Sequence, residues 1–311
     1  MPAAPPSRDT ASTQAALAAA LPALEAEMRR INALLSSGAR EAAMAAYHAL
    51  PERAVQTQRP DLTCRGMVLP GQHVGISLCR IPATPRPGKP AALFLPGLLS
   101  SLPLAAARAV ALIDVADLIV CELPGHGASG VPPVVSLESF AAEYAALLDR
   151  AAAGRIAVFG ESLGGLVALA LGRLRPETIR SVVLIDTPFH LTRPALAAWI
   201  AAAWQAAGER PFVRRICREI MGFDPADGAT LATHRLFGLL AQLPFGCAHL
   251  IGGDLTRSGT ASAVTDEDLA EMRIAAPGLV LPPRVADTGH AVLLDNPTGA
   301  LEALRGCLAA R

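Results

Sequence analysis

The chain has 311 residues, a formal net charge of zero, and 52% hydrophobic against 17% charged residues. This composition supports a sizeable core and excludes a mainly disordered chain, and the balanced charge gives no sign of nucleic acid or an anionic membrane as a partner. Six cysteines without CxxC spacing exclude a zinc ribbon or a thioredoxin-like site. With no signal peptide and no uncharged apolar run long enough to span a bilayer, we expect a cytoplasmic protein.

Residues 1–60 differ in composition from the rest of the chain. Residues 1 to about 12 are rich in Pro, Ser and Thr, which predicts disorder. From Thr13 to about Leu50 the chain is Ala-rich, with apolar residues three or four apart, and this predicts a helical arm kinked or divided at Pro22 and Gly38. We expect the arm either to pack on the main body or to serve in homo-oligomer formation or partner docking.

Short apolar runs bounded by Gly, Pro or Asp predict strands in residues 61–189 and again in residues 247–311. The first two are split by the turn signal Pro70-Gly71, which predicts an antiparallel pair. The later runs alternate with helical patterns, of which Leu137 to about Arg150 is the clearest, and this predicts an α/β fold with a mostly parallel, doubly wound sheet. The expected strands are Met67–Leu69, Val74–Ile81, Ala91–Leu95, Leu118–Cys121, Ile156–Phe159, Val182–Ile185 and His249–Ile251.

Residues 190–246 interrupt this alternation with helix-like segments. Both tryptophans and five of the eight phenylalanines lie between Asp186 and Phe245. Because aromatic side chains carry large apolar area, we interpret the segment as a helical lid with an apolar underside, with ordinary helical packing as the alternative. A cluster of arginines in the segment is either a solvated helix face or a clamp for an anionic group, such as the phosphates of a carrier thioester. The cluster consists of Arg210, Arg214, Arg215 and Arg218.

The central motif is Gly160-Glu161-Ser162-Leu163-Gly164, which directly follows a predicted strand and opens a helical run. This is the G-x-S-x-G pattern in the strand–turn–helix context that a nucleophile elbow requires. The sharp turn strains the serine backbone and lifts its Oγ clear of the sheet, where side chains two residues away on either side would collide. The motif therefore predicts Ser162 as a nucleophile.

A serine hydroxyl is a weak nucleophile and needs an adjacent base. Among the seven histidines, His290 has the best setting, because it follows Gly289 in a predicted tight loop just before the final helical pattern. Such a loop lets the imidazole reach over the sheet edge to Ser162. We therefore predict His290 as the general base.

The third member of such a site is a carboxylate that orients the imidazole and stabilises its cation. Asp254 is our first choice, because it closely follows the strand His249–Ile251 and sites in open α/β sheets lie at the carboxyl ends of strands. Asp186, at the end of the preceding strand, is an alternative. Asp266 and Asp268, in the loop after Asp254, are further alternatives.

Acyl transfer also needs hydrogen-bond donors for the oxyanion of the tetrahedral intermediate. One predicted donor is the backbone N–H of Leu163, the residue after the nucleophile. The other is the N–H of Leu98, because Gly97 allows the loop after the strand Ala91–Leu95 to approach closely.

Four motifs occur in order along the chain, and with them residues 64 to 311 resemble the α/β-hydrolase superfamily. They are Leu95-Pro96-Gly97-Leu98, Leu123-Pro124-Gly125-His126-Gly127, the elbow Gly160–Gly164, and Gly289-His290. The resemblance implies an α/β-hydrolase fold with Ser162 as nucleophile, His290 as base and Leu98 and Leu163 as oxyanion donors, and it makes His126 structural. The chain departs from many relatives in carrying Pro96 and Glu161 where His is common.

These residues predict a serine hydrolase that cleaves a small-molecule carboxylic ester with a mainly apolar acyl group through an acyl-enzyme intermediate. No phosphate-binding Gly loop, dinucleotide fingerprint or metal cluster stands out in the sequence, so we expect no cofactor and no metal. A thioesterase or acyltransferase acting on a carrier-bound acyl group is the first alternative. A non-catalytic binding or scaffold protein that retains the fold is the second.

Overall fold

The computed structural model describes residues 10–151, 154–208, 211–225, 236–241, 243–253 and 261–309. Within these residues the strands form one sheet in the order β1-β2-β4-β3-β5-β6-β7. β2 runs antiparallel to β1 and β4, and the remaining pairs are parallel, which confirms the predicted mostly parallel sheet with its antiparallel lead-in pair. The strands are β1 Arg65–Pro70, β2 Gly75–Ile81, β3 Ala91–Leu95, β4 Asp117–Cys121, β5 Ile156–Glu161, β6 Ile179–Ile185 and β7 Gly246–Leu250.

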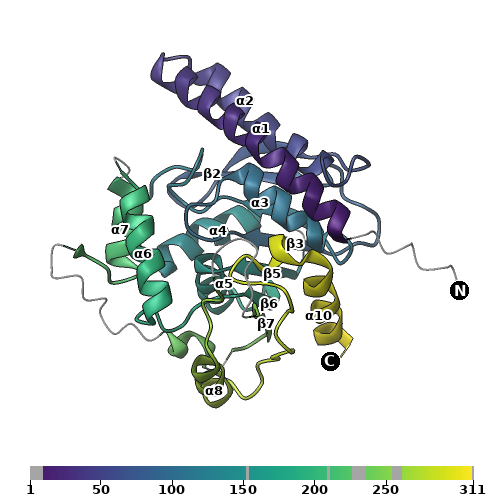
Figure 1. Cartoon of the computed structure of the whole chain (residues 1–311), viewed down its shortest axis with the longest axis vertical. Coiled ribbons are helices and arrows are strands. Elements are labelled where there is room, and N and C mark those ends of the chain that lie inside the picture. Colours follow the sequence, from purple (N-terminus) through teal and green to yellow (C-terminus); the bar gives the residue numbers. More distant parts are fainter. Residues whose placement is uncertain are drawn as a thin grey trace, which may run out of the picture.

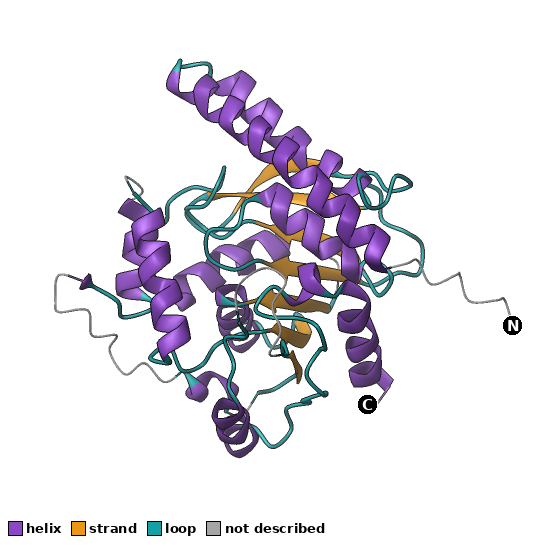
Figure 2. Cartoon of the chain, viewed as in Figure 1, coloured by secondary structure: helices purple, strands orange, loops and turns teal. Residues whose placement is uncertain are grey.

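Helices cover both faces of the sheet, so that the strands lie in the middle layer (Figure 2). Successive strand residues point to opposite faces. Leu93 and Leu95 therefore pack with α4 and α5, whereas Ala92 and Phe94 pack with α3, α10 and the N-terminal arm. The covering helices are α3 Leu102–Ala109, the short η1 Val110–Leu112, α4 Leu137–Ala151, α5 Leu163–Leu174 and α10 Pro297–Ala309.

The N-terminal arm is a hairpin of two helices, α1 (Thr10–Ser36) and α2 (Arg40–Gln56). Gly38, at φ +84°, makes the turn between them, whereas Pro22 lies inside α1 without ending it, so only Gly38 divides the arm. The far end of the hairpin extends beyond the sheet, and its near end lies over α3 (Figure 1). Apolar residues of both helices, among them Ile31 and Leu50, belong to the core on this face. The arm thus packs on the main body, the first of the two expectations, and residues 1–9 lie outside the described part.

The described parts of the segment after β6 contain helices, and these gather at one side of the sheet (Figure 1). Its aromatic rings pack in pairs: Phe212 stacks on Phe140 of α4 at 6.3 Å, and Trp204 meets Phe223 edge-on at 5.7 Å. The described elements are α6 Pro194–Ala206, α7 Pro211–Glu219 and η3 Phe237–Leu240, followed beyond β7 by α8 Asp266–Ala275 and α9 Val292–Asp295. Among the described helices, none combines the length and apolar character needed to cross a membrane.

Candidate active site

The predicted sharp turn is present between β5 and α5. Ser162 has φ +53° and ψ −122°, a backbone conformation that non-glycine residues rarely adopt. The turn leaves no room for side chains: a Cβ at Gly160 would lie 2.5 Å from the carbonyl oxygen of Gly164, and one at Gly164 would lie 2.5 Å from that of Pro96. The Ser162 N–H donates to the carbonyl of Ile185 at 2.9 Å, which ties the turn to the end of β6.

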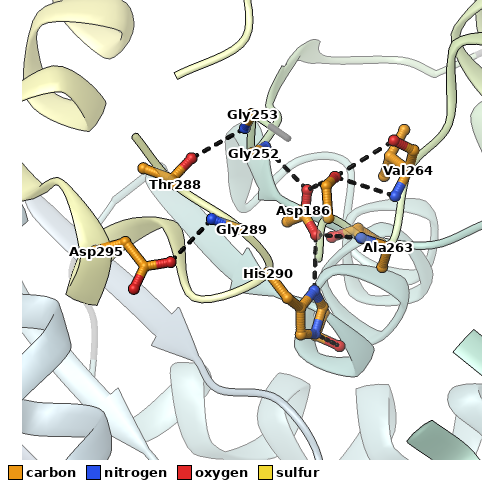
Figure 3. A network of polar contacts seen from close by, with 12 residues as sticks. Asp186, Gly252, Gly253, Ala263, Val264, Thr288, Gly289, His290 and Asp295 are labelled. Atoms are coloured by element: carbon orange, nitrogen blue, oxygen red, sulfur yellow. Dashed lines mark hydrogen bonds and ion pairs between the residues drawn. The ribbon is translucent and has the colours of Figure 1, made fainter. Parts of the chain in front are cut away.

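His290 meets Ser162 directly, with 3.0 Å between its Nε2 and the Ser162 Oγ. The loop that carries the imidazole is fixed by its neighbours (Figure 3). The N–H of Gly289 donates to Asp295 Oδ2 at 2.9 Å, and the hydroxyl of Thr288 accepts from the N–H of Gly253 at 3.1 Å. The two residues singled out from the sequence as nucleophile and base are therefore within hydrogen-bonding distance.

The carboxylate at the other side of the imidazole belongs to Asp186, at the end of β6, and not to the first choice, Asp254. Nδ1–H of His290 donates to Asp186 Oδ2 at 2.7 Å (Figure 3). Asp254 itself lies outside the described residues. The pairing of strands explains this position: Glu161 is opposite Ile185 across β5 and β6, so the residue after Ile185 comes level with Ser162.

The other two aspartates considered from the sequence have different partners. Asp266 forms an ion pair with Arg284 at 2.7 Å, and Asp268 pairs with Arg193 at 3.1 Å and caps the start of α8. Asp186 also carries a sequence signal that Asp254 lacks, because it directly ends an apolar run. The acid position therefore changes from Asp254 to Asp186.

The Asp186 carboxylate is fully buried and is held by donors on both oxygens. Oδ1 accepts from the N–H of Gly252 at 2.9 Å and from the hydroxyl of Ser262 at 2.6 Å, and Oδ2 accepts from the N–H of Ala263 at 2.7 Å as well as from His290. Burial alone would raise the pKa of this carboxyl, but the hydrogen bonds and the attraction to His290 outweigh it and hold the pKa below its ordinary value. Asp186 is therefore a buried carboxylate that remains charged.

The same contact acts on the imidazole in the opposite direction. Burial by itself would lower the pKa of His290, but the hydrogen bond to Asp186 and the attraction of its charge raise that pKa above the ordinary 6.5. A raised pKa makes the imidazole a better proton acceptor and stabilises the imidazolium that forms when it takes a proton from Ser162.

The loop after β3 lies against the nucleophile. A Cβ at Gly97 would come within 3.1 Å of the Ser162 Cβ, so a side chain there would crowd the serine. Leu98 and Leu163, the predicted oxyanion donors, are both buried, and no backbone acceptor for either N–H occurs among the described residues. Their roles remain predictions that this close approach supports.

His126 holds the same loop. Its Nε2 accepts from the N–H of Leu99 at 3.3 Å, while Nδ1 lies 3.2 Å from the carbonyl of Pro124. Both contacts are satisfied together when Nδ1 carries the proton and donates to the carbonyl. Leu99 itself has φ +64°, so the loop bends sharply at this point. His126 thus has the structural position that the family resemblance implies.

A buried ion pair beside the elbow was not foreseen from the sequence. Arg108 of α3 lies 2.9 Å from Glu161, the residue before Ser162, and donates to the hydroxyl of Ser100 at 2.7 Å. One guanidinium therefore links the loop of residues 96–101, here called the oxyanion loop, to the nucleophile elbow. No local pattern indicates this contact, because Arg108 and Glu161 are far apart in sequence and come together only when α3 packs on the sheet.

The arginines of residues 190–246, the helical insertion, form ion pairs and ring contacts with other residues of the insertion. Arg215 and Arg218 form ion pairs with Glu219 and Asp224, and the guanidinium groups of Arg214 and Arg218 lie over the ring of Trp204 at 5.5 and 5.7 Å. Arg210 lies outside the described residues. Because Arg215 and Arg218 are already paired with carboxylates and Arg214 packs on a ring, the arrangement favours packing over a clamp for an anionic substrate.

His249, on β7 near the site, is fully buried. Burial lowers its pKa to about 4, and Nε2 of the neutral ring accepts from the N–H of Thr187 at 2.9 Å. This contact fixes the backbone directly after Asp186. Among the residues that the structure describes, no three His, Cys, Asp or Glu side chains converge in a way that could hold a metal ion.

A serine, a histidine and a buried carboxylate, joined in series at the carboxyl edge of a mostly parallel sheet, define the site of a hydrolase. The family model described as "alpha/beta hydrolase fold" matches residues 90–209. The chain therefore has the α/β-hydrolase fold, and its sequence is similar to those of an esterase and a lipase.

Individual relatives agree with this assignment. The chain is 28% identical to Esterase Rv0045c of Mycobacterium tuberculosis over 62% of its own length and 74% of the relative's. It is 37% identical to Lipase LipV of the same organism, over 21% of its own length and 25% of the relative's. The carboxylesterase CesB of Bacillus subtilis shares the fold with a TM-score of 0.61 at 12% identity, covering 85% of this chain and 98% of that one.

Proposed function

We propose that this chain is a serine hydrolase that cleaves carboxylic esters with a mainly apolar acyl group through an acyl-enzyme intermediate. The observation that carries the proposal is the continuous series of hydrogen bonds from Ser162 Oγ through His290 to Asp186. Ester cleavage is supported by relatives named as an esterase and a lipase. A complete series of this kind favours an enzyme over a scaffold that merely retains the fold.

In the acylation step, Oγ of Ser162 forms a bond to the acyl carbonyl carbon while Nε2 of His290 accepts the Oγ proton. The electron pair of the carbonyl moves to its oxygen, and the N–H groups of Leu98 and Leu163 are the proposed donors for this oxyanion. When the carbonyl re-forms, the bond to the alcohol oxygen breaks, and the imidazolium returns its proton to that oxygen.

Deacylation repeats the sequence with water as nucleophile. His290 accepts a proton from the water, whose oxygen bonds to the acyl carbon; the bond to Ser162 Oγ then breaks and Oγ regains the proton. Asp186 remains ionised throughout and acts by fixing the tautomer of the ring and stabilising the imidazolium. Its lowered pKa supports this role.

The preference for an apolar acyl group is proposed from the helical insertion. The Trp199 ring of α6 meets the His290 ring edge-on at 6.1 Å, so an aromatic surface borders the reacting groups. Ser162 is only 6% exposed, and we propose that residues 190–246 act as a lid over it. A strong preference for acyl-coenzyme A over a simple ester, lost on changing Arg214 and Arg215 to Ala, would show instead that the substrate is a carrier thioester.

The cysteines bear on where such an enzyme works. All six are buried, and none forms a disulfide in the described part of the chain. Cysteines without disulfides are usual in reducing compartments, and we propose a cytoplasmic location.

The proposal is tested with a fluorophosphonate probe and p-nitrophenyl esters of increasing chain length. We expect covalent labelling of the wild-type protein, and both labelling and turnover lost in Ser162→Ala, with kcat lower by at least roughly 10³-fold. Ser181→Ala, on the neighbouring strand β6, serves as the control and keeps both activities. Absence of labelling in the folded wild-type protein would contradict the proposal.

A further inference from the structure

A buried carboxylate connects the N-terminal arm with the loop proposed to bind the oxyanion. Glu122 follows β4 and is fully buried. Its Oε1 accepts from the N–H of Leu102 at 2.8 Å and from the hydroxyl of Tyr47, and its Oε2 accepts from the N–H of Ala128 at 2.9 Å. One side chain therefore brings together the arm, the start of α3 and the loop after β4.

Leu102 is the point where this network meets the catalytic edge. It is the first residue of α3 and lies four residues after Leu98, the proposed oxyanion donor. Its N–H points to both Glu122 Oε1 and the Tyr47 hydroxyl, at 2.8 and 3.2 Å. A carboxylate at the first turn of a helix is also favoured by the helix dipole. The contact thus fixes the place where the oxyanion loop turns into helix.

Tyr47 reaches this point from helix α2 of the arm, 75 residues before Glu122. Tyr47 is 4% exposed, and a Cβ at Gly127 would collide with its hydroxyl, so the side chain is closely packed on both counts. Burial raises the pKa of Tyr47 well above its ordinary value, so the hydroxyl is neutral and serves as a donor to Glu122.

Hydrogen bonding by Tyr47 also affects the carboxylate itself. Burial raises the pKa of Glu122 to about 6, and the hydrogen bonds from Tyr47, Ala128 and Leu102 limit that rise. Without the Tyr47 hydroxyl the pKa would rise further, and a larger fraction of Glu122 would be protonated at neutral pH. A protonated carboxyl accepts less strongly from the Leu102 N–H.

The oxyanion loop is thus held at three successive points. His126 accepts from the N–H of Leu99, Arg108 donates to the hydroxyl of Ser100, and Glu122 with Tyr47 accepts from the N–H of Leu102. The first two attachments come from the hydrolase core, and the family model that matches residues 90–209 includes both. The third depends on the arm, which lies outside that match.

We infer that Tyr47 is a positioning residue for the proposed ester hydrolysis: through Glu122 and Leu102 it holds the loop that carries the Leu98 N–H against Ser162. The arm is then part of the catalytic apparatus and does more than cover the sheet. This inference rests on the proposed function, because the loop matters to the reaction only if an oxyanion forms beside Ser162.

The test compares Tyr47→Phe with Tyr144→Phe. Both changes remove one buried tyrosine hydroxyl and keep the ring, and both hydroxyls contact Glu122, but Tyr144 donates only to its backbone carbonyl, at 2.6 Å. We expect Tyr47→Phe to lower kcat roughly tenfold with KM changed less than about twofold, the sign of an interaction that matters in the transition state, while Tyr144→Phe leaves both nearly unchanged.

Two further measurements separate positioning from general stability. A trifluoromethyl ketone adds to a serine Oγ and places an alkoxide where the oxyanion forms, so its affinity should fall in Tyr47→Phe by the same factor as kcat/KM. Backbone amide exchange in residues 97–102 should be faster in Tyr47→Phe than in Tyr144→Phe. Equal kinetic and exchange behaviour of the two variants overturns the inference while leaving the proposed function intact. A wild-type protein that neither reacts with fluorophosphonate nor cleaves esters overturns both.

Discussion

The carboxyl edge of the sheet and the helical insertion after β6 are held together by different kinds of contact. At the edge, the reacting side chains are fixed largely by main-chain groups: the N–H groups of Gly252 and Ala263 bind Asp186, and Ser162 N–H binds the carbonyl of Ile185. In the insertion, side chains join α6 and α7: Arg214 and Arg218 lie over the Trp204 ring, and that ring meets Phe223 edge-on.

This difference separates two tasks. Hydrogen bonds from main-chain N–H groups are directional, and the side chain of the donating residue does not affect them. They therefore give the precise geometry that proton transfer requires. Apolar contacts are non-directional and tolerate repacking. Changes at the sheet edge should therefore abolish the reaction, whereas changes in the insertion should alter which acyl group is accepted.

The largest effect is expected at the sheet edge, where each of the two candidate acids is replaced separately by asparagine. Asp186→Asn keeps the shape of the side chain but removes the charge that stabilises the His290 imidazolium, and we expect kcat/KM for a p-nitrophenyl ester to fall roughly 10²- to 10⁴-fold. Asp254→Asn is the control and should retain activity close to wild type. If Asp254→Asn caused the larger loss, the assignment of Asp186 would be wrong.

A smaller effect of the same contact concerns pH. The imidazole must be neutral to accept the Ser162 proton, and its pKa is raised above 6.5, so kcat/KM should increase with pH along a limb whose midpoint lies above 6.5. Asp186→Asn removes the main cause of the raised pKa, and the limb of its residual activity should move to lower pH. The measurement is kcat/KM between about pH 5 and 9; a limb that stayed in place would show that Asp186 does not set the pKa of His290.

The smallest effect is expected in the insertion. Trp199→Ala removes apolar area beside His290 and should lower kcat/KM for a long-chain ester roughly 3- to 10-fold more than for the acetate. Trp204→Ala is the matched control on the same helix: Trp204 contacts Phe223, so its loss should lower the melting temperature and leave the ratio between long and short esters unchanged. A change in that ratio for Trp204 but not Trp199 would place the acyl-binding surface elsewhere.

Much of the fold and part of the site could be predicted from local patterns. The strand Ala91–Leu95 has the predicted bounds. Ser162 can be recognised in the sequence because the elbow requires glycines at fixed spacing. His290 stands out because Gly289 precedes it in a loop near the final helix.

The remaining members of the site depend on which segments become neighbours in space. Asp186 lies level with Ser162 only because β5 and β6 are adjacent with Glu161 opposite Ile185, and a single sequence does not reveal this register. The same holds for Arg108 beside Glu161 and for Tyr47 beside Glu122. Each of these contacts joins residues from separate elements, so no motif records it.

The packing of the arm has a consequence for how the chain folds during synthesis. Helices α1 and α2 are synthesised before β1 to β7, so Leu24, Ile31 and Leu50 have no sheet to pack on until those strands have been made. Helix α3, which contacts α2, is made only after β3, and α10 of the same core follows β7. The hydrogen bond of Tyr47 likewise cannot form before Glu122, 75 residues downstream, has been made. The arm therefore reaches its final packing late in synthesis, and until then it is an apolar surface suited to capture by chaperones.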